Sequence, residues 1–303
     1  MEQATKAVVI TGASTGIGRA CVLRMIGAGW RVFATVRKVE DQERLQAEGG
    51  RNLVPVMMDV EDRALIFAAA EQIARACGSG LDGLVNVAGT GMVRPVEYVT
   101  QRDLQKIFDV NVFGQIAVTQ AFLPLLRRKR GRVVNISSVG AHIAIPFAGP
   151  LNASKSAFGC LSDTLRLELY PFGIHVSTVE PGAIATPAVD KTLGDVEGVI
   201  ESLPASGRQQ YGDLLRTVTR RGYEREKNGS PPEAVARVVH HALTASNPRI
   251  RYRVGNHAAL LATLARILPD WLLDAFRFRA LGLPSQFGVV ENPATDHSAD
   301  RAA

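Results

Sequence analysis

The sequence has few cysteines, and their placement excludes several classes of protein. Cys21, Cys77 and Cys160 lie far apart in 303 residues, and none has the spacing of a metal site. Their odd number argues against a disulfide framework, so we expect a reducing cytoplasm and no bound metal. Cys21 and Cys160 fall in apolar helical stretches, which predicts that both lie in the core. The first residues lack the pattern of a signal peptide.

The sequence also lacks a strong excess of one charge and a long uninterrupted apolar run. It carries 35 basic and 29 acidic residues, a net charge of +6. This small excess suits an anionic ligand and does not indicate a nucleic-acid partner. The apolar stretch 257–283 is interrupted by Pro269, so neither half could span a bilayer.

A regular alternation of strand and helix patterns is present instead. Short β-branched runs predict strands, and the longer segments between them have helical patterns. The expected strands are 7–11, 31–36, 53–57, 81–87, 132–137, 173–180 and 250–254, and the helices 19–28, 42–48, 62–77, 101–128, 150–170 and 232–245. This order predicts an α/β fold with a doubly wound parallel sheet, in which ligands bind at the carboxyl ends of the strands.

The first strand runs directly into a glycine-rich turn. The turn covers residues 12–18, and a helix follows it. Besides Ala13 it contains Gly12, Ser14, Thr15, Gly16, Ile17 and Gly18. Glycine allows the backbone to turn tightly and approach a pyrophosphate, while the free N–H groups of the new helix face the anion. The context of strand, turn and helix therefore predicts a nucleotide site.

The rest of the chain predicts one main domain with additions. Residues 1–255 form the nucleotide-binding domain, with an insertion at 183–230 interpreted as a substrate lid or, alternatively, a solvated linker. Residues 256–288 are expected to form two short helices packed on the core or on a partner subunit. Contact of this extension with a membrane surface is the less favoured alternative. Residues 289–303 are polar and expected to be disordered.

Several further segments occur in a characteristic order. They are Asp59-Val60, Asn86-Val87-Ala88-Gly89, Asn111, Asn135-Ile136-Ser137-Ser138, Ala153-Ser154-Lys155 and Pro181-Gly182-Ala183-Ile184-Ala185-Thr186. Together with the glycine turn, they resemble the short-chain dehydrogenase/reductase family, densely over residues 6–190. The segments 34–37 and 248–252 are similar to the hydroxysteroid and retinol dehydrogenase branch.

The resemblance implies a Rossmann fold, an oxidoreductase activity and a set of site residues. Asn111, Ser138 and Lys155 correspond to catalytic residues. The implied cofactor-binding residues are Gly12, Ser14, Thr15, Gly16, Ile17, Gly18, Arg37, Lys38, Asp59, Val60, Asn86, Ala88, Gly89, Lys155, Pro181, Gly182, Ile184 and Thr186. The family commonly pairs through helices equivalent to 101–128 and 150–170, which implies a homodimer or homotetramer.

The end of the second strand bears on cofactor choice. Family members that prefer NAD place an aspartate there, and this chain has Val36 followed by Arg37 and Lys38. A carboxylate would repel a 2′-phosphate, whereas a guanidinium can pair with it. NADP(H) is therefore favoured over NAD(H), unless Arg37 simply points into solvent.

The family's catalytic tyrosine is missing. It lies four residues before the lysine, so that both side chains share a helical face, and here that position is Leu151. Leucine can neither donate nor accept a proton. Altered chemistry would account for this: an imine needs less acid help than a ketone, or Ser138, His142 or a water held by Asn111 and Lys155 delivers the proton.

Three different kinds of protein would also lack this tyrosine. They are a cofactor-binding pseudoenzyme, an isomerase or cyclase on the same scaffold, and an engineered inactive variant of a tyrosine-bearing enzyme. Apolar residues of the insertion suggest a hydrophobic carbonyl or alcohol substrate of steroid or prenyl size, although they could also only close a core. They are Leu193, Val199, Ile200, Leu203, Leu214 and Leu215.

Overall fold

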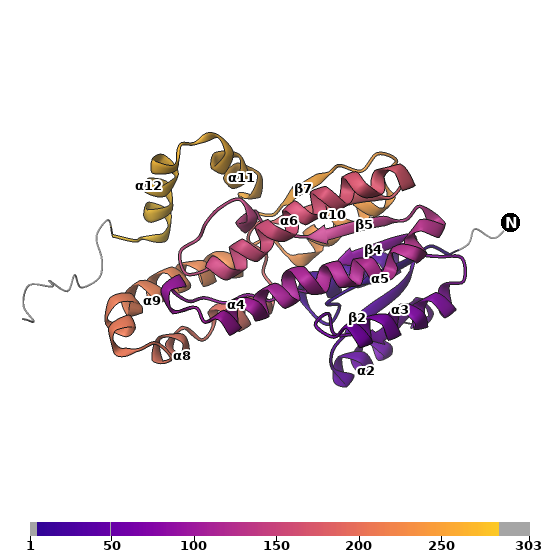
Figure 1. Cartoon of the computed structure of the whole chain (residues 1–303), viewed down its shortest axis with the longest axis horizontal. Helices are drawn as coiled ribbons and strands as arrows, with labels where there is room; N and C mark the ends of the chain where they lie inside the picture. Colours follow the sequence, from indigo (N-terminus) through magenta and orange to yellow (C-terminus); the bar gives the residue numbers. More distant parts are fainter. Residues whose placement is uncertain (1–4, 49, 285–303) are drawn as a thin grey trace, which may run out of the picture.

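A computed structural model describes residues 5–48 and 50–284 (Figure 1). Its centre is a seven-stranded sheet in the order β3-β2-β1-β4-β5-β6-β7, with every neighbouring pair parallel. The strands are β1 (Ala7–Ile10), β2 (Arg31–Val36), β3 (Leu53–Met57), β4 (Gly83–Asn86), β5 (Arg132–Ile136), β6 (His175–Pro181) and β7 (Arg251–Val254). The predicted doubly wound parallel sheet is confirmed.

Helices cover both faces of the sheet. On one face, apolar residues of α1 (Gly16–Gly27), α2 (Val39–Glu48) and α10 (Pro232–Thr244) pack on the strands. On the other, α3 (Arg63–Cys77), α5 (Gly114–Lys129) and α6 (Gly149–Leu169) do the same. The strands are buried on both faces, as their continuous apolar runs require.

The predicted long helix over 101–128 is present, but it contains a π-helical turn that was not predicted. It consists of α4 (Gln101–Phe108), the π-helical turn (Asp109–Phe113) and α5. The Gln115 side chain donates to the Val110 carbonyl within the turn, and the Asn111 side chain bonds to Thr90 outside it. The bonds to Thr90 come from a tertiary neighbour, so the apolar period alone could not reveal the interruption.

Residues 183–230 are largely helical and not a solvated linker. They contain α7 (Ala188–Leu193), α8 (Val196–Glu201) and α9 (Ala205–Lys227). Four of the predicted apolar residues are buried there: Ile200, Leu203, Leu214 and Leu215. They share one apolar cluster with Val93, Phe147, Val218, Leu281 and Leu283. The segment therefore has a core of its own, beside the loops that follow β4 and β5.

The C-terminal extension forms two short helices, as predicted. They are α11 (Ala258–Ile267) and α12 (Asp270–Leu281), separated at Pro269, and they lie together at one end of the molecule (Figure 1). No helix among the described residues is long and apolar enough to cross a membrane. Residues 285–288 of the extension and the tail 289–303 lie outside the described residues.

The cysteine prediction was half right. Cys21 is fully buried, whereas Cys160 is exposed on α6. Cys160 follows two buried residues of α6, Phe158 and Gly159, but is itself exposed. The helical pattern was too weakly amphipathic to assign this position to a face.

Candidate functional site

The glycine turn is packed too closely for side chains at two positions. A Cβ on Gly18 would lie 2.1 Å from the carbonyl oxygen of Gly12, and a Cβ on Gly12 would lie 2.9 Å from Ala88 Cα. Gly12 and Gly16 have φ angles of +60° and +55°, which favour glycine. The turn is therefore a backbone surface that a phosphate group can approach, which fits a dinucleotide.

The first helical turn starts earlier than predicted and faces this surface. Thr15 is the N-cap residue of α1, and its side chain makes no capping bond within the described structure. Gly16, Ile17 and Gly18 form the first turn, with Ile17 packed against the core. Its backbone N–H groups and the helix dipole thus remain available to an anion. The Ser14 carbonyl accepts a bond from Arg44.

The ends of β1 and β4 are tied together beside the turn. Thr11 Oγ1 accepts from the backbone N–H groups of Val87 and Ala88 at 2.8 and 3.0 Å. The Ala88 carbonyl in turn accepts from Gln115 at 2.6 Å. These bonds hold the segment Ala88-Gly89 at the carboxyl edge of the sheet.

The end of β2 carries the predicted basic residues. Val36 is buried, while Arg37 and Lys38 are exposed. Arg37 Nη1 lies 3.9 Å from Asp59 Oδ2 and 3.9 Å from Glu61 Oε2, so the guanidinium lies between two carboxylates that follow β3. Val60, next to Asp59, is buried.

Asn86 belongs to a buried hydrogen-bond network that the sequence did not reveal. Its Nδ2 donates to Thr119 Oγ1 at 2.9 Å and to Asn135 Oδ1 at 2.8 Å, and Asn135 Nδ2 donates to Ser162 Oγ at 2.8 Å. The network joins β4 and β5 to α5 and α6. It holds together the elements that carry the other site residues.

Asn111 links the π-helical turn to two neighbouring segments. Its Oδ1 accepts from the Thr90 N–H at 2.8 Å, and its Nδ2 donates to the Thr90 carbonyl and to Ser154 Oγ at 2.9 Å each. Ser154 Oγ donates onward to the Leu151 carbonyl. The side-chain amide is thus engaged in positioning the segment after β4 and the start of α6.

Lys155 lies deep in the same site. Its side chain is buried and its Nζ donates to the Ile136 carbonyl at 3.0 Å. Burial lowers the pKa of Lys155 to about 8. A Cβ on Gly89 would lie 3.5 Å from this Nζ and 3.3 Å from Asn111 Oδ1, so the three residues surround one point.

Two further predicted residues lie on the elements that carry Lys155 and its acceptor: Ser138 comes just after β5, and Leu151 is on α6. Ser138 follows β5, and its Oγ accepts from the Gly140 N–H at 3.0 Å, which leaves the hydroxyl proton available to another acceptor. Leu151 lies one turn before Lys155 on α6, half-buried, with its Cδ2 3.3 Å from the position of a Cβ on Gly91. An apolar side chain thus occupies the helical face that Lys155 shares.

The segment after β6 closes the site. The Gly182 N–H donates to the Val254 carbonyl at 2.8 Å, and the Thr186 Cβ lies 3.2 Å from the position of a Cβ on Gly16. The segment Pro181–Thr186 is therefore brought against the glycine turn, although 170 residues separate Gly16 from Thr186. The fold thus unites the first and last of the predicted cofactor segments.

Glu226 was missed by the sequence analysis. Its Oε2 accepts from the Ile184 N–H at 3.2 Å, and burial raises the pKa of this carboxyl. Two backbone hydrogen bonds flank this contact. The Ala185 N–H donates to the Ser230 carbonyl, and the Ser230 N–H donates to the Ala183 carbonyl. These contacts clamp the end of α9 to the segment after β6, and no local signal on α9 indicates them.

His142 is paired away from the candidate catalytic group. Its Nε2 lies 2.8 Å from Glu180 Oε1, and Glu180 also bonds to Arg251 and Arg253. Burial acts to raise the pKa of Glu180, but the bonds and charges of His142 and Arg251 outweigh it and lower the pKa. In this structure the ring of His142 is therefore paired with a carboxylate of β6.

Comparison with known proteins agrees with this geometry. The profile of the short chain dehydrogenase family matches residues 6–196. The chain belongs to this family. It is 36% identical to human retinol dehydrogenase 5 over 288 residues, which cover 92% of this chain and 90% of that protein. It is 31% identical to the NADPH-dependent 3-dehydrocapnine reductase of Ornithobacterium rhinotracheale over 279 residues, 90% and 96% of the two chains.

A solved structure has the same fold. The crystal structure of a short-chain dehydrogenase from Streptomyces avermitilis superposes with a TM-score of 0.71 and 27% identity, covering 94% of this chain and all of that one. The chain is thus an oxidoreductase of the short-chain type with a nucleotide-binding Rossmann fold.

Proposed function

We propose that the protein is an NADP(H)-dependent oxidoreductase that transfers hydride to or from a carbonyl, alcohol or imine carbon of an apolar small molecule. The observation that carries the proposal is the convergence of Lys155, Asn111 and Gly89 at the end of β5, where Lys155 Nζ bonds to the Ile136 carbonyl two residues before Ser138. A purely cofactor-binding protein would need the lysine but not a serine whose hydroxyl proton is available. When bound, NADP(H) supplies or accepts the hydride.

The glycine turn would hold the pyrophosphate through backbone N–H groups of Gly16, Ile17 and Gly18, with Ser14 and Thr15 beside it. Asp59 and Val60 would lie at the adenine ring, and Asn86, Ala88 and Gly89 along the ribose side. Pro181, Gly182, Ile184 and Thr186 would hold the nicotinamide amide. These assignments follow from the family resemblance and from the close approach of Thr186 to Gly16.

NADP(H) is the proposed choice over NAD(H). Arg37 is 63% exposed and lies beside two carboxylates, and Lys38 next to it is also exposed. A 2′-phosphate would give the guanidinium a stronger, bidentate partner than the 3.9 Å contacts it has in the structure. The similarity to an NADPH-dependent reductase supports the same preference.

Proton transfer in this enzyme would be atypical. Ser138 would donate a hydrogen bond to the developing oxyanion, and Lys155 would hold the nicotinamide ribose. Leu151 offers no proton, and His142 is engaged by Glu180. The proton would therefore come from water. Alternatively, the substrate would be an imine, whose reduction depends less on a general acid than that of a ketone.

An apolar substrate is supported by the comparison with relatives, since the buried cluster of Ile200, Leu203 and Leu215 forms the segment's own core. The relatives include a retinol dehydrogenase, which by its name acts on an apolar alcohol. We propose that residues 183–230 act as the lid over this substrate.

A homodimer or homotetramer is the proposed assembly, and the cytoplasm the proposed compartment. Apolar side chains exposed on α4 to α6 would be covered by a second copy: Leu104, Phe113, Leu161 and Leu167. The three cysteines are free thiols in the structure, which suits a reducing compartment.

The deciding experiment compares the protein with its Leu151→Tyr variant on ketones and cyclic imines, after NADPH binding is confirmed by fluorescence titration. A tyrosine one turn before Lys155 should raise ketone reduction by roughly a hundred- to ten-thousand-fold. Leu151→Phe is the matched control, since it adds a ring without a hydroxyl. Absence of NADPH binding, or no turnover by either protein on any substrate, would contradict the proposal.

A further inference from the structure

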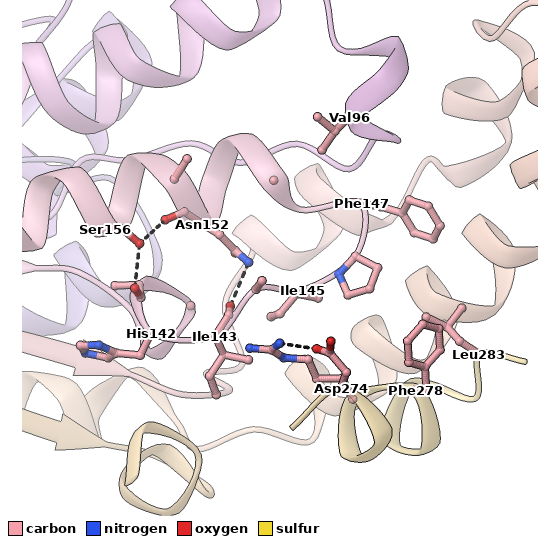
Figure 2. A pocket seen from close by; sticks show the side chains of 17 residues that line it. Val96, His142, Ile143, Ile145, Phe147, Asn152, Ser156, Asp274, Phe278 and Leu283 are labelled. Carbon is pink, nitrogen blue, oxygen red and sulfur yellow. Dashed lines mark hydrogen bonds and ion pairs between the residues drawn. The ribbon is translucent and has the colours of Figure 1, made fainter. Parts of the chain in front are cut away.

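A cavity of about 580 Å³ lies outside the candidate catalytic group. It is bounded by the loop after β5, the first turns of α6, Val96 and α12 with Leu283 (Figure 2). None of Ser138, Leu151 and Lys155 lines it. Its volume is in the range of small-molecule sites.

The cavity is on a different side of α6 from the catalytic group. Leu151 and Lys155 share one face of the helix. Asn152 and Ser156, the residues directly after them, lie on the neighbouring face and line the cavity. Asn152 Nδ2 donates to the Ile143 carbonyl at 3.0 Å and Ser156 Oγ to the Ala141 carbonyl at 2.7 Å (Figure 2). The loop is thus bonded to α6 along this side.

The walls of the cavity are mainly apolar, because several backbone carbonyls of the loop are already hydrogen-bonded. The carbonyls of Ala141 and Ile143 accept from α6, and the carbonyl of Phe147 accepts from the Arg94 N–H at 2.8 Å. Most side chains that line the space from the loop and from α12 and the residues after it are apolar: Ile143, Ile145, Pro146, Phe147, Phe278 and Leu283. Such a surface suits a hydrocarbon chain.

Polar residues also line the cavity, among them His142, Asp274 and the cation Arg277. Arg277 of α12 lines the cavity with a side chain only 20% exposed, and its Nη1 donates to Asp274 Oδ1 at 2.7 Å. Its Nε is enclosed and has no partner among the described residues. Asp274 is 53% exposed and engages one terminal nitrogen, so the other donors of the guanidinium remain for a second carboxylate.

We infer that this cavity is a binding site for a single-chain amphiphile with an anionic head, a medium- or long-chain carboxylate. The chain would lie between the loop after β5 and α12, and the carboxylate would pair with Arg277. The site adjoins Ser138 through Gly140, whose N–H bonds to the serine hydroxyl, but it contains none of the proposed cofactor or catalytic residues, and the inference does not depend on the proposed substrate or cofactor.

The test measures binding to the full-length protein by titration calorimetry with three probes of equal chain length: decanoate, decan-1-ol and decylammonium. Decanoate should bind most tightly, with one molecule per chain, and decylammonium most weakly. Saturating NADPH should leave decanoate binding unchanged, since the two sites share no residue.

Variants on α12 separate the head-group and chain contributions. Arg277→Gln should weaken decanoate at least tenfold and leave decan-1-ol unchanged. Arg279→Gln, two residues along the same helix and exposed, is the matched control and should bind decanoate normally. Phe278→Ser should weaken all three probes to the same degree.

Three results would overturn the inference. They are no decanoate binding, a preference for decanoate that survives Arg277→Gln, or displacement of decanoate by NADPH. Because NADPH binding is measured separately in each variant, failure here is distinguishable from failure of the proposed oxidoreductase function.

Discussion

Lys155 Nζ donates a 3.0 Å hydrogen bond to the backbone carbonyl of Ile136, the last residue of β5. A single neutral acceptor does not balance the charge of a buried ammonium, and burial lowers the pKa of Lys155 to about 8. The same relationship places the ammonium beside Gly89 and Asn111, where the candidate site converges.

The first prediction concerns the pH dependence of stability. The pKa of Lys155 falls from 10.5 when unfolded to about 8 when folded, so the unfolded chain binds more protons between these values. Stability should therefore rise as pH increases through this window, and fall as pH drops toward 8. Relative to Lys155→Met, the wild-type protein should gain about 2 kcal/mol between roughly pH 8 and pH 10, measured by urea unfolding without cofactor. Parallel curves for the two proteins would contradict the prediction.

The second prediction concerns the glycine turn. Gly18→Ala should lower the free energy of unfolding by at least about 2 kcal/mol and abolish NADPH binding, because its Cβ would meet the Gly12 carbonyl oxygen at 2.1 Å. Gly27→Ala, at the other end of α1, is the matched control. Nothing lies within 4 Å of its Cβ position, so stability should be unchanged or rise by up to about 1 kcal/mol. Thermal unfolding and fluorescence titration check both, and similar losses in the two variants would count against the structure of the turn.

The third prediction concerns cofactor choice. Arg37→Gln should weaken NADPH binding by about tenfold or more and leave NADH binding nearly unchanged, because a charged bond to the 2′-phosphate is lost. Lys38→Gln should have a smaller effect on NADPH, since it contributes charge without a bidentate fork. Dissociation constants for both cofactors check this. Equal losses for NADH and NADPH in Arg37→Gln would show that Arg37 does not read the phosphate.

The fourth prediction concerns the network around Asn86. Ser162→Ala should destabilise the protein by about 1–3 kcal/mol, because Asn135 Nδ2 loses its buried acceptor. Thr164→Ala on the same helix removes an exposed hydroxyl bonded only to the Cys160 carbonyl, and should change stability by less than about 0.5 kcal/mol. Urea unfolding of both variants is the measurement. A loss from Thr164→Ala as large as that from Ser162→Ala would show that burial of the network does not matter.

The sequence by itself determined the sheet and the glycine turn, and it predicts that Leu151 occupies the position of the family's tyrosine. Strands β2 and β3 occur with the predicted bounds, because short β-branched runs between turn residues are a local signal. The glycine turn was equally local, since strand, glycines and helix follow one another along the chain. Leu151 was located because its distance from Lys155 is one helical turn.

Only the tertiary structure decided how distant segments meet. The bond of Glu226 to Ile184, the pairing of His142 with Glu180 and the cavity under α12 each join residues tens to more than a hundred positions apart. The π-helical turn likewise contacts a distant segment, because Asn111 within it bonds to Thr90, which follows another strand. Period and order predicted the sheet and the edge at which the segments gather, but they do not specify which individual side chains come into contact there.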